Sequence, residues 1–99
     1  MTLIQLPLDV SLADTASHKT DLLSVHNAEH IVVRCPSGSD PDLRLVEAHG
    51  HILGCLPRPI AHRVSAACLG DLFGSIVVVE VSPLPYVRVR LTSAATQQL

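Results

Sequence analysis

A chain of 99 residues, 47% hydrophobic and 16% charged, has the length and composition of one small globular domain and is not a disordered segment. The formal net charge of −2 excludes an overall basic field for nucleic acid, although every arginine lies within residues 34–99. No apolar run reaches the roughly 18 residues of a membrane span, and the start lacks the basic region of a signal peptide. The three cysteines are odd in number and irregularly spaced, with no disulfide framework, which favours a reducing, cytoplasmic setting.

The first third of the chain predicts one strand followed by a loop. Residues 2–12 alternate loosely between apolar and polar types, which predicts a strand interrupted by Pro7. Residues 13–20 are small and polar and predict a loop or a turn of helix, and residues 22–25 predict a short strand. We therefore expect residues 1–30 to form an N-terminal strand and loop.

The middle of the chain predicts a strand, a loop and a hairpin. Residues 29–34 are rich in β-branched side chains, as is typical of a strand, and residues 35–42 gather Pro, Gly, Ser and Asp, as is typical of a loop. A hairpin over 43–48 and 51–56 follows, because Gly50 supplies the positive φ of a tight turn. Gly54 within the second hairpin strand predicts a bulge or the close approach of another backbone.

The last part predicts one helix and two strands. Pro57 and Pro59 suit the first turn of a helix that runs to residue 69 and ends at Gly70. The apolar run 76–81 predicts a central strand. Residues 86–91 alternate, so three apolar side chains face inward while Tyr86, Arg88 and Arg90 face outward. We expect residues 92–99 to be a flexible tail.

The order of these elements predicts the fold class. It is mainly β with one helix, a small OB-like or SH3-like β-barrel of about six strands, with the helix between the central hairpin and the last two strands. One helix cannot cover both faces of a parallel sheet, so a βαβ arrangement is not expected. The chain shows neither repeats nor an internal boundary, and residues 1–99 are expected to form one domain.

Residues 31–81 resemble a known family, the HIRAN domain. Its first signature is a loop like E-P-x-N-P-x-D-x-N-A after a strand, and this chain keeps Pro36, Asp40 and Pro41 there. Its second signature is a glycine hairpin, then V-G-x-L-P-R and a helix. The matching residues here are Gly50, Leu53, Gly54, Leu56, Pro57, Arg58 and Ala61. The loop is one residue shorter than in the family, and the aromatic residue before the Asp is absent.

The resemblance implies a non-enzymatic β-barrel module that binds single-stranded DNA or DNA ends, acts in DNA repair or processing, and needs no cofactor. It implies a helicase or nuclease as partner. It carries over Asp40 as the residue at a strand end and Arg58 as a basic contact to phosphate. With it, residues 31–91 are the HIRAN-like core, and the N-terminal segment is divergent.

The residues themselves predict a basic face for nucleic acid, with cations for phosphates and a ring for base stacking. Its candidates are Arg34, Arg44, Arg58, Arg63, Tyr86, Arg88 and Arg90, and the resemblance adds Asp40 to these nucleic-acid-binding candidates. The alternative is an ordinary solvated strand face, because any half-buried strand alternates in this way.

Other interpretations remain open. A metal site is not expected, and the set to examine for one is His49, His51, Cys55 and Cys35, whose spacing matches no standard zinc module. Nucleophilic catalysis would require Cys55 or Cys68 beside His62. The high apolar content favours a protein-interaction or homo-oligomeric assembly module as the alternative function. A dimeric transcription factor of the swapped-hairpin barrel type is a third possibility. That type has a G-x-I-x-x-P-x-x-I pattern, and the corresponding spacing in this chain is two residues longer.

Overall fold

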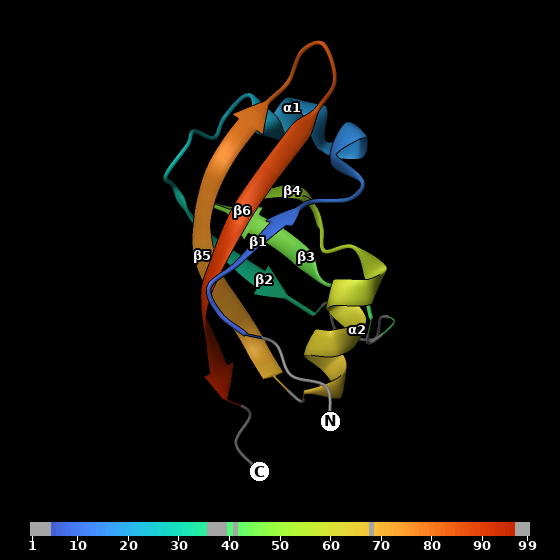
Figure 1. Ribbon diagram of the computed structural model, residues 1–99. Helices are drawn as coiled ribbons and strands as arrows, with labels where there is room; N and C mark the ends of the chain where they lie inside the picture. The colour runs from blue at the N-terminus through green and yellow to red at the C-terminus, as the bar shows by residue number, and fades with distance from the viewer. Residues whose placement is uncertain (1–4, 36–39, 41, 68, 97–99) are drawn as a thin grey trace.

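The computed structural model describes residues 5–35, 40, 42–67 and 69–96, which form one antiparallel sheet with two short helices (Figure 1). The strands pair in the order β1-β6-β5-β2-β3-β4. In chain order the elements are β1 (Leu8–Ser11), the 3-10 turn η1 (Thr15–His18), α1 (Lys19–Leu22), β2 (His30–Arg34), β3 (Leu45–Ala48), β4 (His51–Cys55), α2 (Arg58–Ala66), β5 (Leu69–Glu80) and β6 (Tyr86–Thr96). Within the described part of the chain no helix is long and apolar enough to cross a membrane.

The sheet curls into a half-barrel whose two edges meet at one point. Just after β1, Ala13 forms an isolated antiparallel bridge to Cys55 at the end of β4, with N–H···O distances of 2.8 and 2.9 Å. Gly54 makes this contact possible, because its φ is +155° and a Cβ there would lie 2.6 Å from the carbonyl oxygen of Ala13. The predicted close approach of another backbone to Gly54 is therefore confirmed.

The interior of the half-barrel is filled by Val, Leu, Ile and Ala side chains. The predicted alternation along β6 is confirmed, since Val87, Val89 and Leu91 are fully buried while the residues between them face outward. The long strands β5 and β6 pair along most of their length and are the two longest strands of the sheet. α2 packs on one end of the half-barrel through Ala61 and Val64, and α1 lies at the opposite end (Figure 1).

The structure corrects the prediction of one helix. The turn of helix considered for residues 13–20 is confirmed as η1, a second short helix, α1, continues to Leu22, and the strand predicted over 22–25 is wrong. The reason is the spacing of the buried side chains. Leu22 and Val25 are both buried, and their separation of three residues matches a helical turn followed by a bend better than the alternation of a strand.

Two predicted boundaries are also wrong. α2 ends at Ala66 and Gly70 lies within β5, where a Cβ would come 3.1 Å from the carbonyl oxygen of Ala95 on β6. Residues 92–96 are not a tail, because they continue β6 and pair with β5. Pro36, Pro41, Cys68 and residues 97–99 lie outside the described residues.

Candidate nucleic-acid interface

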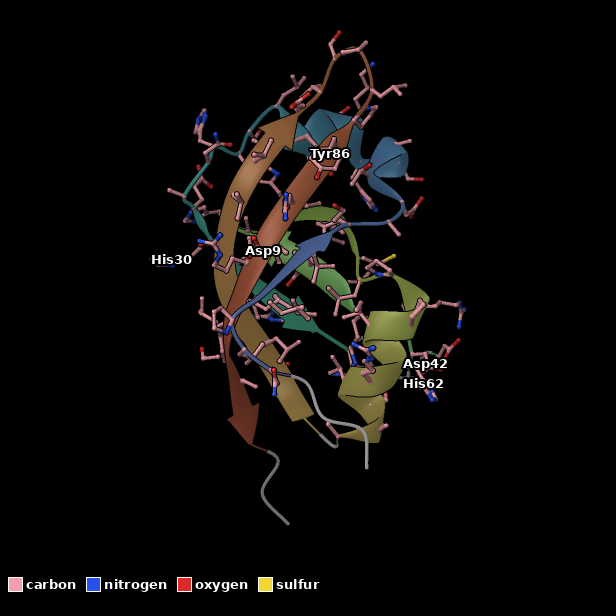
Figure 2. All side chains as sticks on the ribbon, viewed as in Figure 1. Asp9, His30, Asp42, His62 and Tyr86 are labelled. Carbon is pink, nitrogen blue, oxygen red and sulfur yellow. The ribbon has the colours of Figure 1, made fainter. Side chains whose placement is uncertain are left out.

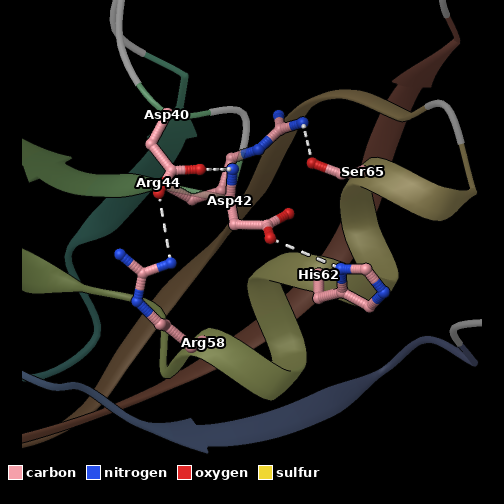
Figure 3. A network of polar contacts seen from close by, with 6 residues as sticks. All are labelled: Asp40, Asp42, Arg44, Arg58, His62 and Ser65. Atoms are coloured by element: carbon pink, nitrogen blue, oxygen red, sulfur yellow. Dashed lines mark hydrogen bonds and ion pairs between the residues drawn. The ribbon is translucent and has the colours of Figure 1, made fainter.

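A ladder of three polar contacts joins the segment before β3 to α2 (Figure 3). Asp40 and Asp42 belong to a turn in which the N–H of Leu43 donates to the Asp40 carbonyl at 2.9 Å, and Arg44 follows this turn just before β3. Their partners Arg58, His62 and Ser65 lie at one-turn intervals along α2 and therefore share one face of the helix. The contacts hold this loop against the helix at one end of the half-barrel.

The first contact joins the two residues that the family resemblance carries over. The Arg58 guanidinium donates to Oδ2 of Asp40 at 3.1 Å, and the backbone N–H of Asp42 donates to Oδ1 at 2.8 Å. The Asp42 N–H first, and then Arg58, lower the pKa of the Asp40 carboxyl below its ordinary value. The Arg58 and Asp40 side chains are 74% and 43% exposed. An exposed pair of this kind is worth little in stability, so Arg58 can exchange partners readily.

The start of α2 explains why Arg58 is presented to solvent. Pro57 is the N-cap residue, Pro59 follows in the first turn, and no side chain caps the helix. The Pro57 carbonyl accepts the N–H groups of Ile60 and Ala61 at 3.0 and 2.9 Å. Buried Ala61 then fixes the rotation of the helix, which leaves Arg58 on the solvent side next to the loop.

The second contact is longer than the first. Nδ1 of His62 lies 3.4 Å from Oδ2 of Asp42. The His62 and Asp42 side chains are 71% and 30% exposed, and both lie beside Asp40 and Arg58 (Figure 3). The cluster therefore places two carboxylates, one arginine and one histidine on one small surface.

Arg44 forms the third contact and differs from the prediction. Its side chain is directed between the loop and α2, where Nη2 of the guanidinium donates to the Ser65 hydroxyl at 3.4 Å. The residue is only 7% exposed, and its Nε is buried with no hydrogen-bond partner in the described part of the molecule. Arg44 therefore lies beneath the loop and does not face solvent as a surface phosphate ligand would.

Three of the predicted residues lie on a different surface, the outer face of β6 beside β1. The Asp9 carboxylate accepts hydrogen bonds from Nε and Nη2 of Arg90 at 2.7 and 3.1 Å. Nη2 of Arg88 lies 3.6 Å from the same carboxylate. The Arg90 hydrogen bond lowers the pKa of the Asp9 carboxyl, and Asp9 in turn raises the pKa of Arg90. The Tyr86 hydroxyl is 3.1 Å from that of Ser11.

The predicted basic face is thus not one surface. Tyr86 and Asp9 lie well away from Asp42 and His62 (Figure 2). Arg34 is in a third place, paired with Glu47 at 3.5 Å on β2 and β3. Arg63 is exposed on α2, but it lies about 140° around the helix from Arg58 and so off the face that carries the ladder.

The residues considered for a metal are not brought together. His49 contacts Glu29 at 3.4 Å, His51 contacts Asp21 at 3.0 Å, and Cys55 takes part in the bridge to Ala13. Across residues 5–35, 40, 42–67 and 69–96, no group of three or more His, Cys, Asp or Glu side chains is arranged for a metal ion. Burial first, and then the charge of Asp14, raise the pKa of the Cys55 thiol, which disfavours a reactive thiolate.

Sequence reasoning missed Asp42, Ser65 and Asp9 as partners and considered His62 only for catalysis. The helical spacing of 58, 62 and 65 is a signal that could have found the α2 side of the ladder. Asp9 has no such signal, because it is 81 residues from Arg90 in the chain.

No protein-family model, curated protein or solved structure matches the chain. The function must therefore be argued from the geometry of these residues.

Proposed function

We propose that this chain is a non-enzymatic module that binds the end of a single nucleic-acid strand. The binding surface is formed by Asp40, Asp42, Arg58 and His62 and is called here the loop–α2 surface. The observation that carries the proposal is the 3.1 Å contact between Arg58 and Asp40, which are 18 residues apart in the chain and both exposed.

The chemistry of this surface suits a strand end. An ionised carboxylate only accepts hydrogen bonds, so Asp40 matches the hydroxyl of a terminal sugar. A guanidinium only donates and is positively charged, so Arg58 matches the phosphate that joins the terminal nucleotide to the next. Hydroxyl and phosphate are neighbours in a terminal nucleotide, as Asp40 and Arg58 are on the surface. Arg63 adds a second exposed cation on the same helix for a phosphate further along the strand.

The finer description of the fold belongs to the same proposal. We regard the half-barrel as an OB-like barrel of the HIRAN type, with α2 between the β3–β4 hairpin and the last two strands. Support comes from the element order and from the contact between the two residues that the resemblance carries over. On this interpretation the chain acts inside the cell in DNA repair or processing, beside a helicase or nuclease.

The outer face of β6 is left out of the proposed site. Its two arginines share the carboxylate of Asp9, and Tyr86 is directed to Ser11 (Figure 2). Arg88→Ala is therefore a matched control for Arg58→Ala, because each removes one exposed arginine from a carboxylate contact.

Fluorescence anisotropy with a labelled single strand tests the proposal. We expect a strand with a free 3′ hydroxyl to bind more tightly than the same strand with a 3′ phosphate, because two carboxylates repel the added charge. Affinity should fall steeply between about 50 and 200 mM salt, because the entropy gained when binding releases counterions from the phosphates becomes smaller as the salt concentration rises. Absence of binding at about 50 mM salt contradicts the proposal.

A second candidate function, protein interaction or self-association, is favoured by an apolar groove next to α1. The groove has a volume of about 540 Å³ and is lined by Leu22, Leu23, Val25, His26, Asn27, Val79 and Val81. Leu23 is 68% exposed, and Leu84, on the turn between β5 and β6, is 75% exposed. Light scattering over a range of concentrations tests self-association, and a constant monomer mass contradicts it.

A further inference from the structure

We infer that the loop–α2 surface selects a strand that ends in ribose, whose terminal sugar presents two adjacent hydroxyls, over one that ends in deoxyribose. The inference rests on the proposed function and adds the sugar class to it. Its basis is the juxtaposition of Asp40 and Asp42 on one exposed loop, next to Arg58 and His62 on α2 (Figure 3).

The two carboxylates are held in place and still have acceptor capacity. Each carboxylate oxygen has two lone pairs. Oδ1 of Asp40 receives the Asp42 N–H, and Oδ2 receives Arg58, which leaves one lone pair on each oxygen. Asp42 has a single long contact, 3.4 Å to His62, through Oδ2. The surface therefore offers two oriented acceptor groups and requires donors from its ligand.

A ligand with two adjacent hydroxyl donors meets that requirement. The 2′ hydroxyl distinguishes a ribose end from a deoxyribose end, and carboxylates bind ribose hydroxyls in dinucleotide-binding folds. A deoxyribose end has one hydroxyl and satisfies one carboxylate. A terminal phosphate has no strong donor at neutral pH and brings negative charge to both.

Positive charge lies next to the two carboxylates. Like charges so close repel each other, and the Arg58 guanidinium, 3.1 Å from Oδ2 of Asp40, offsets this on the solvent side. Arg44 lies below them in the same network, almost wholly buried, with an Nε that has no partner in the described residues. The guanidinium of Arg44 thus lies beneath the loop that carries the two aspartates.

A ribose with two free hydroxyls can also come from a free mononucleotide. The chemistry is shared, and the exposed cations Arg58 and Arg63 favour the strand, because a mononucleotide has only one phosphate group to reach them. The experiment must separate these two sources.

The test uses one labelled DNA strand with different 3′-terminal nucleotides, bound to the complete chain and followed by anisotropy. The ends are deoxyribose, ribose, ribose with a 2′-O-methyl group, and ribose oxidised by periodate. We expect the ribose end to bind about tenfold more tightly than the deoxyribose end, as one hydrogen bond to a charged group allows. The methylated and oxidised ends should lose this advantage.

Asp42→Ala should abolish the preference for ribose while the strand with a deoxyribose end still binds. Glu80→Ala is the matched control, since it removes an exposed acid from β5 and should leave the ratio of the two affinities unchanged. The comparison of ends on the parent chain does not depend on whether Asp42→Ala folds.

The outcomes separate the two proposals. Equal affinity for ribose and deoxyribose ends, both above the 3′-phosphate end, overturns this inference and leaves the proposed function in place. No binding of any strand overturns the proposed function itself. Adenosine 5′-monophosphate is the competitor that separates the two sources of ribose. If it displaces the labelled strand at the same concentration as the unlabelled strand does, the choice of a strand is overturned and a mononucleotide is identified as the ligand.

Discussion

The backbone of Gly54 lies so close to Ala13 that a Cβ on Gly54 would stand 2.6 Å from the Ala13 carbonyl oxygen. This contact is where the two edges of the half-barrel meet. Gly54 also has φ of +155°, a conformation that side chains other than glycine rarely adopt. The position therefore combines a steric requirement with a conformational one.

We expect Gly54→Ala to lower the free energy of unfolding by about 2–4 kcal/mol, because strain and displacement of the bridge add together. Gly50→Ala is the control. Gly50 has φ of +82°, but a Cβ there would meet nothing within 4 Å, so only conformational strain of about 1 kcal/mol is expected. Urea unfolding of both variants measures the difference, and equal effects would contradict the steric role of the bridge.

Arg58→Ala should weaken binding of a single strand about tenfold and reduce the salt slope by about one, as loss of one phosphate contact predicts. Arg88→Ala should leave both quantities near those of the parent, because Arg88 lies on the outer face of β6 with Asp9. Anisotropy titrations at several salt concentrations measure both. A larger loss for Arg88→Ala would place the interface on β6 instead.

The pair of Asp9 and Arg90 should make stability depend on pH in the acidic range. The pKa of Asp9 is lowered in the folded state, so its contribution is present above the unfolded value near 3.8 and is lost as pH falls through the lower folded value. Asp9→Asn should therefore lower the urea midpoint at pH 6, and the difference from the parent should shrink towards pH 3. A difference that persists unchanged at pH 3 would mean that the aspartate stabilises the protein without its charge.

Local signals in the sequence predicted the strands better than the contacts between them. Val87, Val89 and Leu91 alternate with polar residues, and that pattern alone identifies the buried face of β6. Gly54 between apolar residues indicated a close backbone approach, but the partner, Ala13, could not be known. Residues 13–20 predicted only a loop or a turn of helix, because η1 and α1 have four residues each, too few for a helical pattern to repeat.

The candidate site was predictable only in part for the same reason. Asp40 and Arg58 were each carried over through the family resemblance, but nothing in the sequence predicted that they contact each other. Arg88 and Arg90 were read as free cations because their partner, Asp9, lies at the other end of the chain. A sequence shows the charge on a strand face, whereas the fold decides whether a distant carboxylate already neutralises it.

Arg44 provides the clearest test of that distinction between a surface cation and a buried one. A buried charge without a carboxylate partner carries a desolvation penalty, and an apolar side chain of similar length can replace it without loss of stability. We expect the free energy of unfolding of Arg44→Met to be within about 1 kcal/mol of the parent value or above it. That of Arg44→Ala should be about 2 kcal/mol lower than the parent value because of the cavity the substitution leaves. Thermal and urea unfolding measure these changes. Anisotropy on Arg44→Met then separates support of the loop from direct contact: a smaller loss of affinity than in Arg58→Ala agrees with a residue beneath the loop, and an equal loss would show that Arg44 reaches the phosphate after all.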